Sequence, residues 1–481
     1  MTATRREVDS FGAVDVPVDA LWGPQTARSL RFFAIGTQRM PLEVVHAIAW
    51  IKWAAAGANR ELQGLDPARA EAIAQAAQWV AEGRVDEAFP LSAWQTGSGT
   101  QSHMNVNEVI AGLASHALGA FPAGADRADS ATGSAGSVGT ARPVDAHDEV
   151  NLGQSTNDVF PSAVHIAVAL QARDELLPAL AVLHTALADR AAAFEGIVKV
   201  GRTHLQDATP LTLGQEFSGY AAQLATCGQH LRHALHGVHA LALGGTAVGT
   251  GLNTHPEFGA RVAEALAERL ALPLVQAENL FAAVAGQESL VAWHGQLRLL
   301  AVVLAKVAGD IRLMGSGPRA GLGELRLPQN EPGSSIMPGK VNPTQVEALT
   351  MVCAQVMGHD ATIGFAASQG QLELNAFQPL IALDTLDSQR MLADAMRSFA
   401  THCVAGLQVD ATRVARLLDE SLMLVTALVP HIGYDRAARI AQDAERNGLT
   451  LREATLSQGA ATAEDFDTWV DPHKMLGPRP R

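Results

Sequence analysis

Cysteine is scarce in this sequence, with only 3 among 481 residues. Cys227, Cys353 and Cys403 lie far apart and form no Cys-x-x-Cys pair. Their number and spacing argue against a disulfide framework and against a cysteine-based zinc site. The first residues also lack an apolar stretch after Arg5 and Arg6, so no secretory signal is expected. We expect a cytoplasmic protein in a reducing compartment.

Charged side chains are few as well: 17% of the residues are charged and 48% are hydrophobic. This composition excludes a disordered chain, and much apolar area should be buried between elements or between subunits. With 35 basic and 49 acidic residues the net charge is −14, which argues against a nucleic-acid partner. The most apolar stretch, 297–304, is interrupted by Arg298 and is far shorter than the roughly 20 residues of a membrane span, so no membrane association is expected.

The strongest pattern in the sequence is helical. No proline occurs between 287 and 314, and apolar residues recur there in alternating steps of three and four. They are Leu290, Trp293, Leu297, Leu300, Leu304, Val307, Ile311 and Met314. Such a seam predicts a long helix inside a bundle, and 211–235 and 379–399 are predicted as further long helices. Alternating Val, Ile and Thr are scarce, so we expect a mainly α fold with little sheet.

Two segments interrupt the helical pattern. Residues 121–146 are small, polar and rich in glycine, which predicts a long surface loop. Residues 331–343 read EPGSSIMPGKVNP, which predicts a loop through Gly339 and a helix start at Asn342 (as N-cap) and Pro343. Two serines, a lysine and a helix N-terminus together suit a carboxylate or an oxyanion, although an ordinary exposed loop is the alternative.

Three further polar clusters lie in otherwise apolar stretches, at 96–102, 154–158 and 202–207. Each alone is a weak signal, because Ser, Thr and Asn runs usually cap helices. Four histidines recur at every third position, and successive steps of three drift around a helix, so the four side chains cannot converge on one metal ion. They are His230, His233, His236 and His239. Without a credible ligand set, we expect no metal.

These motifs resemble those of class II fumarases in the fumarate-lyase superfamily. GSSIMPGKVN at 333–342 is similar to the superfamily signature GSSxMPxKxN, and WQTGSGTQSHMNVNEV, QSTNDVFPSA and GRTHLQDATP follow the family's order. The resemblance covers nearly the whole chain. It implies a mainly α, fumarase/aspartase-type three-domain fold with a long central helical bundle, and we expect domains at 1–150, 151–408 and 409–481. It also implies a homotetramer with a twenty-helix core and active sites shared by three subunits.

The resemblance further implies the residues of the active site. Ser334 matches the family's catalytic serine, His204 its catalytic histidine, and Glu331 the carboxylate paired with that histidine. Lys340 matches a residue that stabilises charge and binds substrate. The implied substrate-binding residues are Ser98, Gly99, Thr100, Ser155, Thr156, Asn157, Thr203, Ser335, Lys340, Val341 and Asn342.

The implied reaction is reversible anti addition of water to fumarate, giving (S)-malate through an aci-carboxylate, without a metal or an organic cofactor. Two alternatives stay open. One is a related lyase acting on aspartate or a substituted fumarate, although GKVNPTQ after the signature serines argues against aspartase. The other is an enzymatically inactive structural homologue, against which intact Ser334, His204 and Lys340 argue.

The chain departs from the family at three places, and the first is the loop at 121–146, which is longer than is usual for the family. His103 stands where most members have Asn, and it is expected near the cleft. A second, shallow dicarboxylate site of the family corresponds here to Arg142, Asp145, Ala146, His147 and Asp148. Asp145 replaces a histidine there and would repel a dianion, so we expect this second site to be weak or absent at neutral pH.

Overall fold

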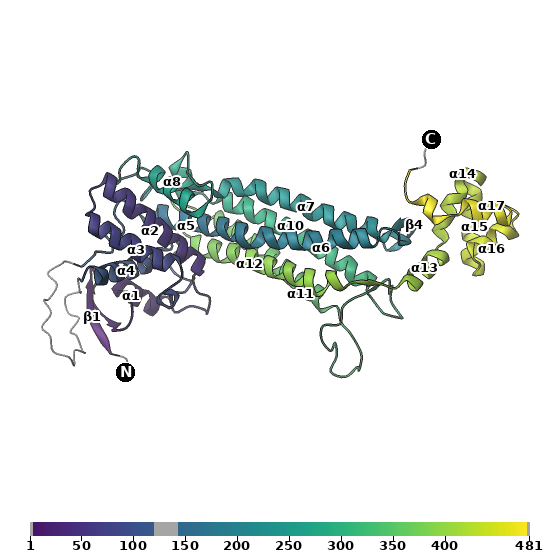
Figure 1. The fold of residues 1–481 in the computed structure, drawn as a ribbon, viewed down its shortest axis with the longest axis horizontal. Helices are drawn as coiled ribbons and strands as arrows, with labels where there is room; N and C mark the ends of the chain where they lie inside the picture. Colours follow the sequence, from purple (N-terminus) through teal and green to yellow (C-terminus); the bar gives the residue numbers. More distant parts are fainter. Residues whose placement is uncertain (1–2, 120–142, 479–481) are drawn as a thin grey trace. The chain divides into compact units, whose positions relative to one another are not determined.

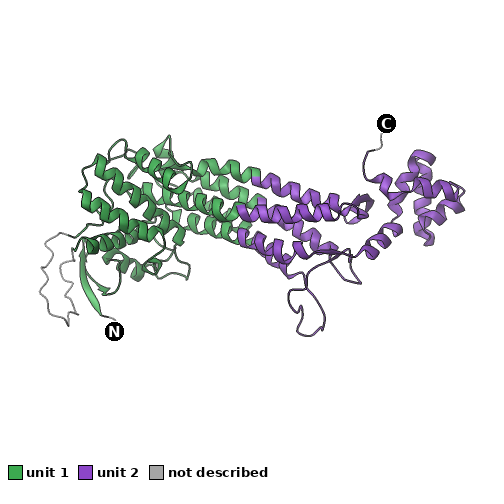
Figure 2. Cartoon of the chain, in the orientation of Figure 1, with its two compact units in different colours: residues 1–177, 229–299, 355–391 green, residues 178–228, 300–354, 392–481 purple. Residues whose placement is uncertain are grey.

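The structure is a computed structural model that describes residues 3–119 and 143–478. The loop expected at 121–146 lies mostly outside these described residues, and so does Arg142. The chain forms two compact units, which are coloured separately in Figure 2. The first comprises 1–177, 229–299 and 355–391, and the second comprises 178–228, 300–354 and 392–481. The division into three domains expected from the resemblance stays a prediction.

The first unit combines helices from the N-terminal part of the chain with later ones such as α8 (Figure 1). Its helices are α1 (Pro24–Phe32), α2 (Leu42–Leu62), α3 (Pro67–Ala81), α4 (Thr100–Ala117), α5 (Thr156–Gln171), α8 (Phe258–Leu270) and α9 (Leu280–Ala285). Its strands are β1 (Thr4–Asp9), β2 (Gly12–Pro17), β5 (Ala240–Leu241) and β6 (Val275–Gln276). Helix α2 packs against α3, α5 and α8, and α4 packs against α3 and α5, so α2, α4 and α5 share one core.

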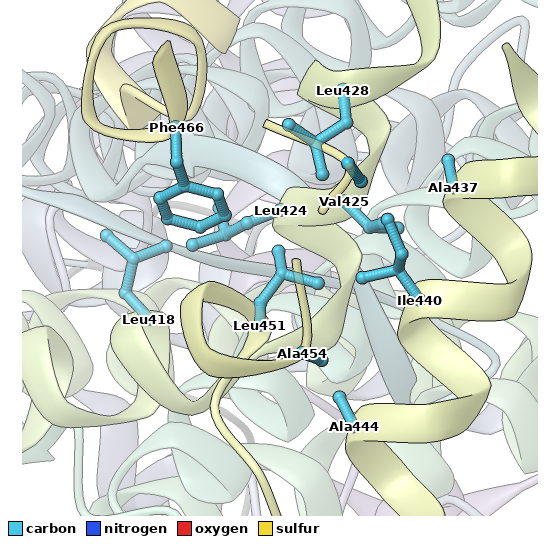
Figure 3. Close-up of a cluster of buried hydrophobic side chains, with 11 residues drawn as sticks. Leu418, Leu424, Val425, Leu428, Ala437, Ile440, Ala444, Leu451, Ala454 and Phe466 are labelled. Carbon is cyan, nitrogen blue, oxygen red and sulfur yellow. The ribbon is translucent and has the colours of Figure 1, made fainter. Parts of the chain in front are cut away.

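The second unit contains the C-terminal elements and two small antiparallel sheets. Its strands are β3 (Val198–Thr203), β4 (Gln206–Thr212), β7 (Leu325–Arg326) and β8 (Gln408–Val409). Its short helices are α13 (Ala411–Glu420), α14 (Val429–Ile432), α15 (Tyr434–Asn447), α16 (Leu451–Ser457) and α17 (Ala463–Trp469). Side chains such as Leu424, Ile440, Leu451 and Phe466 close a buried apolar cluster between these helices (Figure 3).

Five long helices complete the fold: α6 (Leu177–Ala193), α7 (Leu213–Val238), α10 (Glu288–Met314), α11 (Thr344–Ala367) and α12 (Gln378–His402). The three long helices predicted from the sequence are confirmed as α7, α10 and α12, and every residue of the predicted seam on α10 is buried. In the first unit Trp293 of α10 donates its indole N–H to Gln389 of α12 at 2.7 Å. In the second unit the Tyr220 hydroxyl of α7 donates to Asp310 of α10 at 2.9 Å. Bundle packing therefore occurs in both units.

Sheet content is small, as predicted. The described strands pair only as two-stranded sheets. Short segments of 3₁₀-helix, and one of π-helix (η2), connect the main elements: η1 (Asp86–Ala88), η2 (Ala172–Leu176), η3 (Val404–Gly406), η4 (Leu422–Leu428) and η5 (Pro472–Met475). No helix in the described part of the chain has the length and apolar character needed to cross a membrane.

Candidate active site

The first candidate segment is the turn that starts α4. Gly99 precedes the helix with φ +80°, a conformation that favours glycine, and a Cβ there would lie 2.3 Å from the Phe160 ring. A Cβ at Gly97 would lie 1.4 Å from the carbonyl oxygen of Ala376, so only glycine fits this position as well. The tight turn brings the hydroxyls of Ser98 and Thr100 to within 2.8 Å of each other.

The second candidate segment is the N-terminus of α5. Ser155 caps the helix by accepting the Asn157 N–H, and Asp158 accepts the Ser155 N–H at 3.0 Å, which together form a capping box. The other Asp158 oxygen accepts the N–H groups of Gly244 and Thr246, each at 3.0 Å. Burial raises the pKa of Asp158 to about 6, although these hydrogen bonds oppose the rise. The helix start that carries Ser155, Thr156 and Asn157 is therefore fixed from both sides.

A buried polar cluster lies behind this helix start. Thr156 Oγ1 is 2.7 Å from His103 Nδ1, and His103 Nε2 is 2.7 Å from Lys52 Nζ. Lys52 also donates to Asn151 Oδ1 at 2.8 Å and to Gln154 Oε1 at 3.0 Å. Burial lowers the pKa of Lys52 and that of His103 well below their ordinary values, and the nearby ammonium lowers that of His103 further. His103 is therefore a neutral imidazole at physiological pH.

The third candidate segment is the turn between β3 and β4. Thr203 pairs with Gln206, so His204 and Leu205 form a two-residue turn, with φ +57° and +60°. Such hairpin turns favour Asn and Gly, so His and Leu hold this left-handed backbone at a cost. His204 is exposed at the tip of the hairpin.

Buried charges hold the base of this hairpin. Glu324, which is fully buried, accepts from Arg202 at 2.8 Å and lies 3.4 Å from Lys199. Lys199, which is 2% exposed, also contacts Glu216 at 3.0 Å. Each of these charges is paired, and the strand that ends in Thr203 is thereby fixed in position.

The fourth candidate segment is the loop of residues 331–343 before α11, here called the signature loop. Ser334 Oγ accepts the backbone N–H groups of Met337 at 3.0 Å and of Ile336 at 3.3 Å. The loop is closed at its ends, where Gly333 N donates to Lys340 O at 3.0 Å. Helix α11 begins at Thr344, so Pro343 and not Asn342 directly precedes it, and the predicted helix start is one residue too early. The Asn342 amide instead donates to Gly333 O. Hydrogen bonds donated to an ionised group favour its charged form, so the two N–H groups stabilise negative charge on Ser334 Oγ.

The structure thus gathers the expected residues into two sets. In the first unit, Ser98, Gly99 and Thr100 share one turn, and Ser155, Thr156 and Asn157 share the next helix start; the contact between His103 and Thr156 joins these segments. In the second unit, Thr203 and His204 lie on the hairpin. The others lie on the signature loop: Glu331, Ser334, Ser335, Lys340, Val341 and Asn342. No hydrogen bond joins Glu331 to His204 in the described part of the chain, so their pairing stays a prediction.

Sequence reasoning missed two buried charges of the first unit, Lys52 and Asp158. Lys52 had a usable signal, since it is the one charge in the apolar run AIAWIKWAAA. Asp158 was visible only as part of a polar cluster, although its place three residues after Ser155 is typical of a capping box. Among the described residues, no three His, Cys, Asp or Glu side chains gather as a metal site would require.

The segment expected to form a second dicarboxylate site is a turn before α5. Asp145 Oδ1 accepts the N–H groups of His147 at 2.8 Å and of Asp148 at 2.7 Å. His147 Nε2 lies 2.7 Å from the Gln25 amide nitrogen. The carboxylate of Asp145 thus occupies two donors that could otherwise bind an external anion.

Comparison with known proteins matches these motifs to one family. The model of the lyase family matches residues 12–358, and that of the fumarase C C-terminus matches 424–477. The class II fumarate hydratase of Chromobacterium violaceum is 57% identical over 99% of this chain and 100% of its own length. That of Methylorubrum extorquens is 56% identical over 99% of this chain and 97% of its own length.

The fold agrees with this assignment. The crystal structure of a recombinant class II fumarase from Schistosoma mansoni covers 99% of this chain and 100% of its own, with a TM-score of 0.93 and 41% identity. The chain belongs to the class II fumarate hydratase family of lyases.

Proposed function

We propose that this protein catalyses the reversible hydration of fumarate to (S)-malate by anti addition of water, as a step of the tricarboxylic acid cycle. The observation that carries the proposal is the signature loop, where two backbone N–H groups donate to Ser334 Oγ on the same loop as the exposed Lys340. That arrangement suits a base that must carry negative charge next to a dicarboxylate.

The difficult step, in the direction from malate, is removal of a barely acidic proton from C3. The electron pair of the C–H bond moves toward the neighbouring carboxylate and gives an aci-carboxylate. We assign Ser334 Oγ as the base that takes this proton. Lys340 and Asn342 are assigned to the charge that develops on the carboxylate, because donors that act where charge develops lower the barrier.

His204 is assigned to the oxygen at C2. As an imidazolium it gives a proton to the leaving hydroxide, and in the reverse direction the neutral ring takes a proton from the attacking water. The left-handed turn presents the ring outward from the end of β3. Glu331 is assigned to orient the ring in the assembled site.

Substrate binding is assigned to the neutral donors of the two helix starts. The hydroxyls of Ser98 and Thr100 and the polar groups of Ser155, Thr156 and Asn157 surround the N-termini of α4 and α5, where helix dipoles favour anions. Neutral donors and one lysine explain how a protein with net charge −14 binds a dianion.

We further propose a homotetramer whose active sites each draw residues from three subunits, and a cytoplasmic location. Large apolar side chains on the long helices support the assembly. They include Val302 at 49%, Leu313 at 43%, Met351 at 68% and Phe365 at 64% exposure in the single chain. The three free, buried cysteines are compatible with a reducing compartment.

The test is to incubate the protein with fumarate, with mesaconate, and with fumarate plus ammonia, and to identify the products by NMR. We expect (S)-malate from fumarate and no aspartate. Aspartate would favour the related lyase, and no product from any mixture would favour an inactive homologue.

A parallel arm tests whether a metal takes part. After EDTA treatment and desalting, we expect the hydration rate to stay within about twofold of the untreated rate. Loss of activity that returns on addition of a divalent metal would contradict the proposal that no metal takes part.

A further inference from the structure

The buried cluster behind α5 contains a lysine whose hydrogen-bond partners are all neutral. Lys52 is fully buried, and its Nζ lies within 3.0 Å of Asn151 Oδ1, Gln154 Oε1 and His103 Nε2. His103 is also fully buried, and its other ring nitrogen lies 2.7 Å from the Thr156 hydroxyl. An unbroken chain of hydrogen bonds thus runs from a buried charge to a hydroxyl assigned to the substrate.

The orientation of the two amides is fixed by the backbone. Asn151 Nδ2 donates to Gln154 O at 3.2 Å, and Gln154 Nε2 donates to Val150 O and Leu152 O at 3.2 and 3.1 Å. Their side-chain oxygens therefore face Lys52. An ammonium group has three N–H donors and no acceptor, so two donors serve these oxygens and the third serves His103 Nε2.

With Lys52 charged, as the inference requires, this count places the ring proton of His103. Because Nε2 accepts from Lys52, the ring proton of the neutral imidazole is on Nδ1, which donates to Thr156 Oγ1. The nearby carboxylate of Asp158 supports the charge of Lys52 by attraction. The Thr156 oxygen accepts from His103, so the hydroxyl proton points elsewhere.

We propose that Lys52 and His103 set the direction of the Thr156 hydroxyl, so that its proton is presented to a carboxylate of the bound substrate. His103 is then a positioning residue for substrate binding that acts through Thr156. The inference rests on the proposed function, in which Thr156 binds the dicarboxylate. It also gives a role to the residue at which this chain departs from most of its family.

Two amide variants separate the two contacts of the ring. The amide nitrogen of Asn lies near the position of His Nδ1, so His103→Asn keeps a donor for Thr156. Gln places its amide near the position of Nε2, so His103→Gln keeps a partner for Lys52 and loses the donor to Thr156. We expect His103→Gln to raise KM for fumarate about tenfold, with kcat within about threefold. We expect His103→Asn to keep KM within about twofold.

A tenfold change equals about 1.4 kcal/mol, which fits the loss of one oriented hydrogen bond to a charged ligand. A rise in KM without a fall in kcat means loss of binding common to substrate and transition state. In a Thr156→Val background, which has no hydroxyl to orient, His103→Gln should leave KM unchanged. Circular dichroism and thermal unfolding of each variant separate misfolding from these effects.

Equal KM values for the Asn and Gln variants, or a tenfold rise that persists in the Thr156→Val background, would overturn the inference. A direct readout holds even if fumarate is not the substrate. In protein labelled with ¹⁵N-histidine, the solid-state spectrum of the wild type minus that of His103→Asn should show a neutral ring protonated at Nδ1. A ring protonated at Nε2 would overturn the inference independently of the proposed function.

Discussion

At the scale of single residues, the proposed proton abstraction depends on Ser334, which is half-buried on a loop outside the core. Replacing it with alanine removes the proposed base but leaves the packing of the core unchanged. We expect Ser334→Ala to lower kcat about 10²- to 10⁴-fold, the usual contribution of a general base. Helix content and oligomeric mass should stay those of the wild type. A variant with the wild-type rate would assign the base elsewhere.

Asp145 is expected to weaken dicarboxylate binding at the second site. Its carboxylate already accepts the His147 and Asp148 N–H groups and adds a like charge, which costs on the order of 1–4 kcal/mol against a second charge about 4 Å away. We expect Asp145→Ala to strengthen malate binding at this turn about tenfold, measured by titration calorimetry at pH 7.5.

Asp145→Glu is the matched control, because it keeps the charge and should show no such gain. Crystals of the wild type soaked in malate at pH 7.5 give a second check. A fully occupied dicarboxylate in contact with Asp145 and His147 would contradict the prediction.

At the scale of elements, the β3–β4 turn trades stability for the placement of His204. Leu205 is 69% exposed and has φ +60°, which costs a non-glycine residue about 1 kcal/mol. We expect the free energy of unfolding of Leu205→Gly, measured by urea denaturation, to exceed that of Leu205→Ala by about 1 kcal/mol. Alanine removes the leucine side chain but keeps the backbone strain, whereas glycine relieves it. We also expect Leu205→Gly to lower kcat, since a flexible turn no longer fixes the ring. Equal stability of the two variants would contradict this account.

The elements that sequence could predict are those with local signals. Helix α10 follows from a seam of apolar residues within 27 positions, and the structure buries that seam. The start of α11 was predicted one residue too early, and Asn342 instead closes the loop onto Gly333. That contact spans nine residues, and helix-capping patterns do not extend so far.

The contacts around the candidate site follow from packing that no local pattern encodes. Lys52, His103 and Thr156 meet only because α2, α4 and α5 share one core. The left-handed turn at His204 contains neither Asn nor Gly, the residues from which such a turn is predicted. Candidate residues could therefore be named from motifs, and their roles stay predictions, whereas the contacts that hold each of them required the structure.

At the scale of the whole molecule, the low charged fraction of 17% and the exposed apolar side chains of the long helices point to the same cause. An isolated chain would leave Met351 and Phe365 of α11 in water, and burying such a side chain contributes about 1.5–3 kcal/mol. Assembly of four chains would repeat this gain at each copy of the interface. The proposed tetramer thus explains a surface that would otherwise favour aggregation.

The last prediction tests this assembly and the sharing of active sites together. We expect Phe365→Glu to reduce the mass in light scattering below that of four 50.5 kDa chains, because it places a charge at the proposed interface. Hydration activity should fall in parallel with the tetramer fraction, since a separated chain lacks the residues that its neighbours supply. Phe11→Glu is the matched control: Phe11 is 87% exposed in the turn between β1 and β2, two strands that pack against α1, and the variant should keep both mass and activity. A fully active monomer of Phe365→Glu would contradict the shared site, because one chain would then hold every group that the reaction needs.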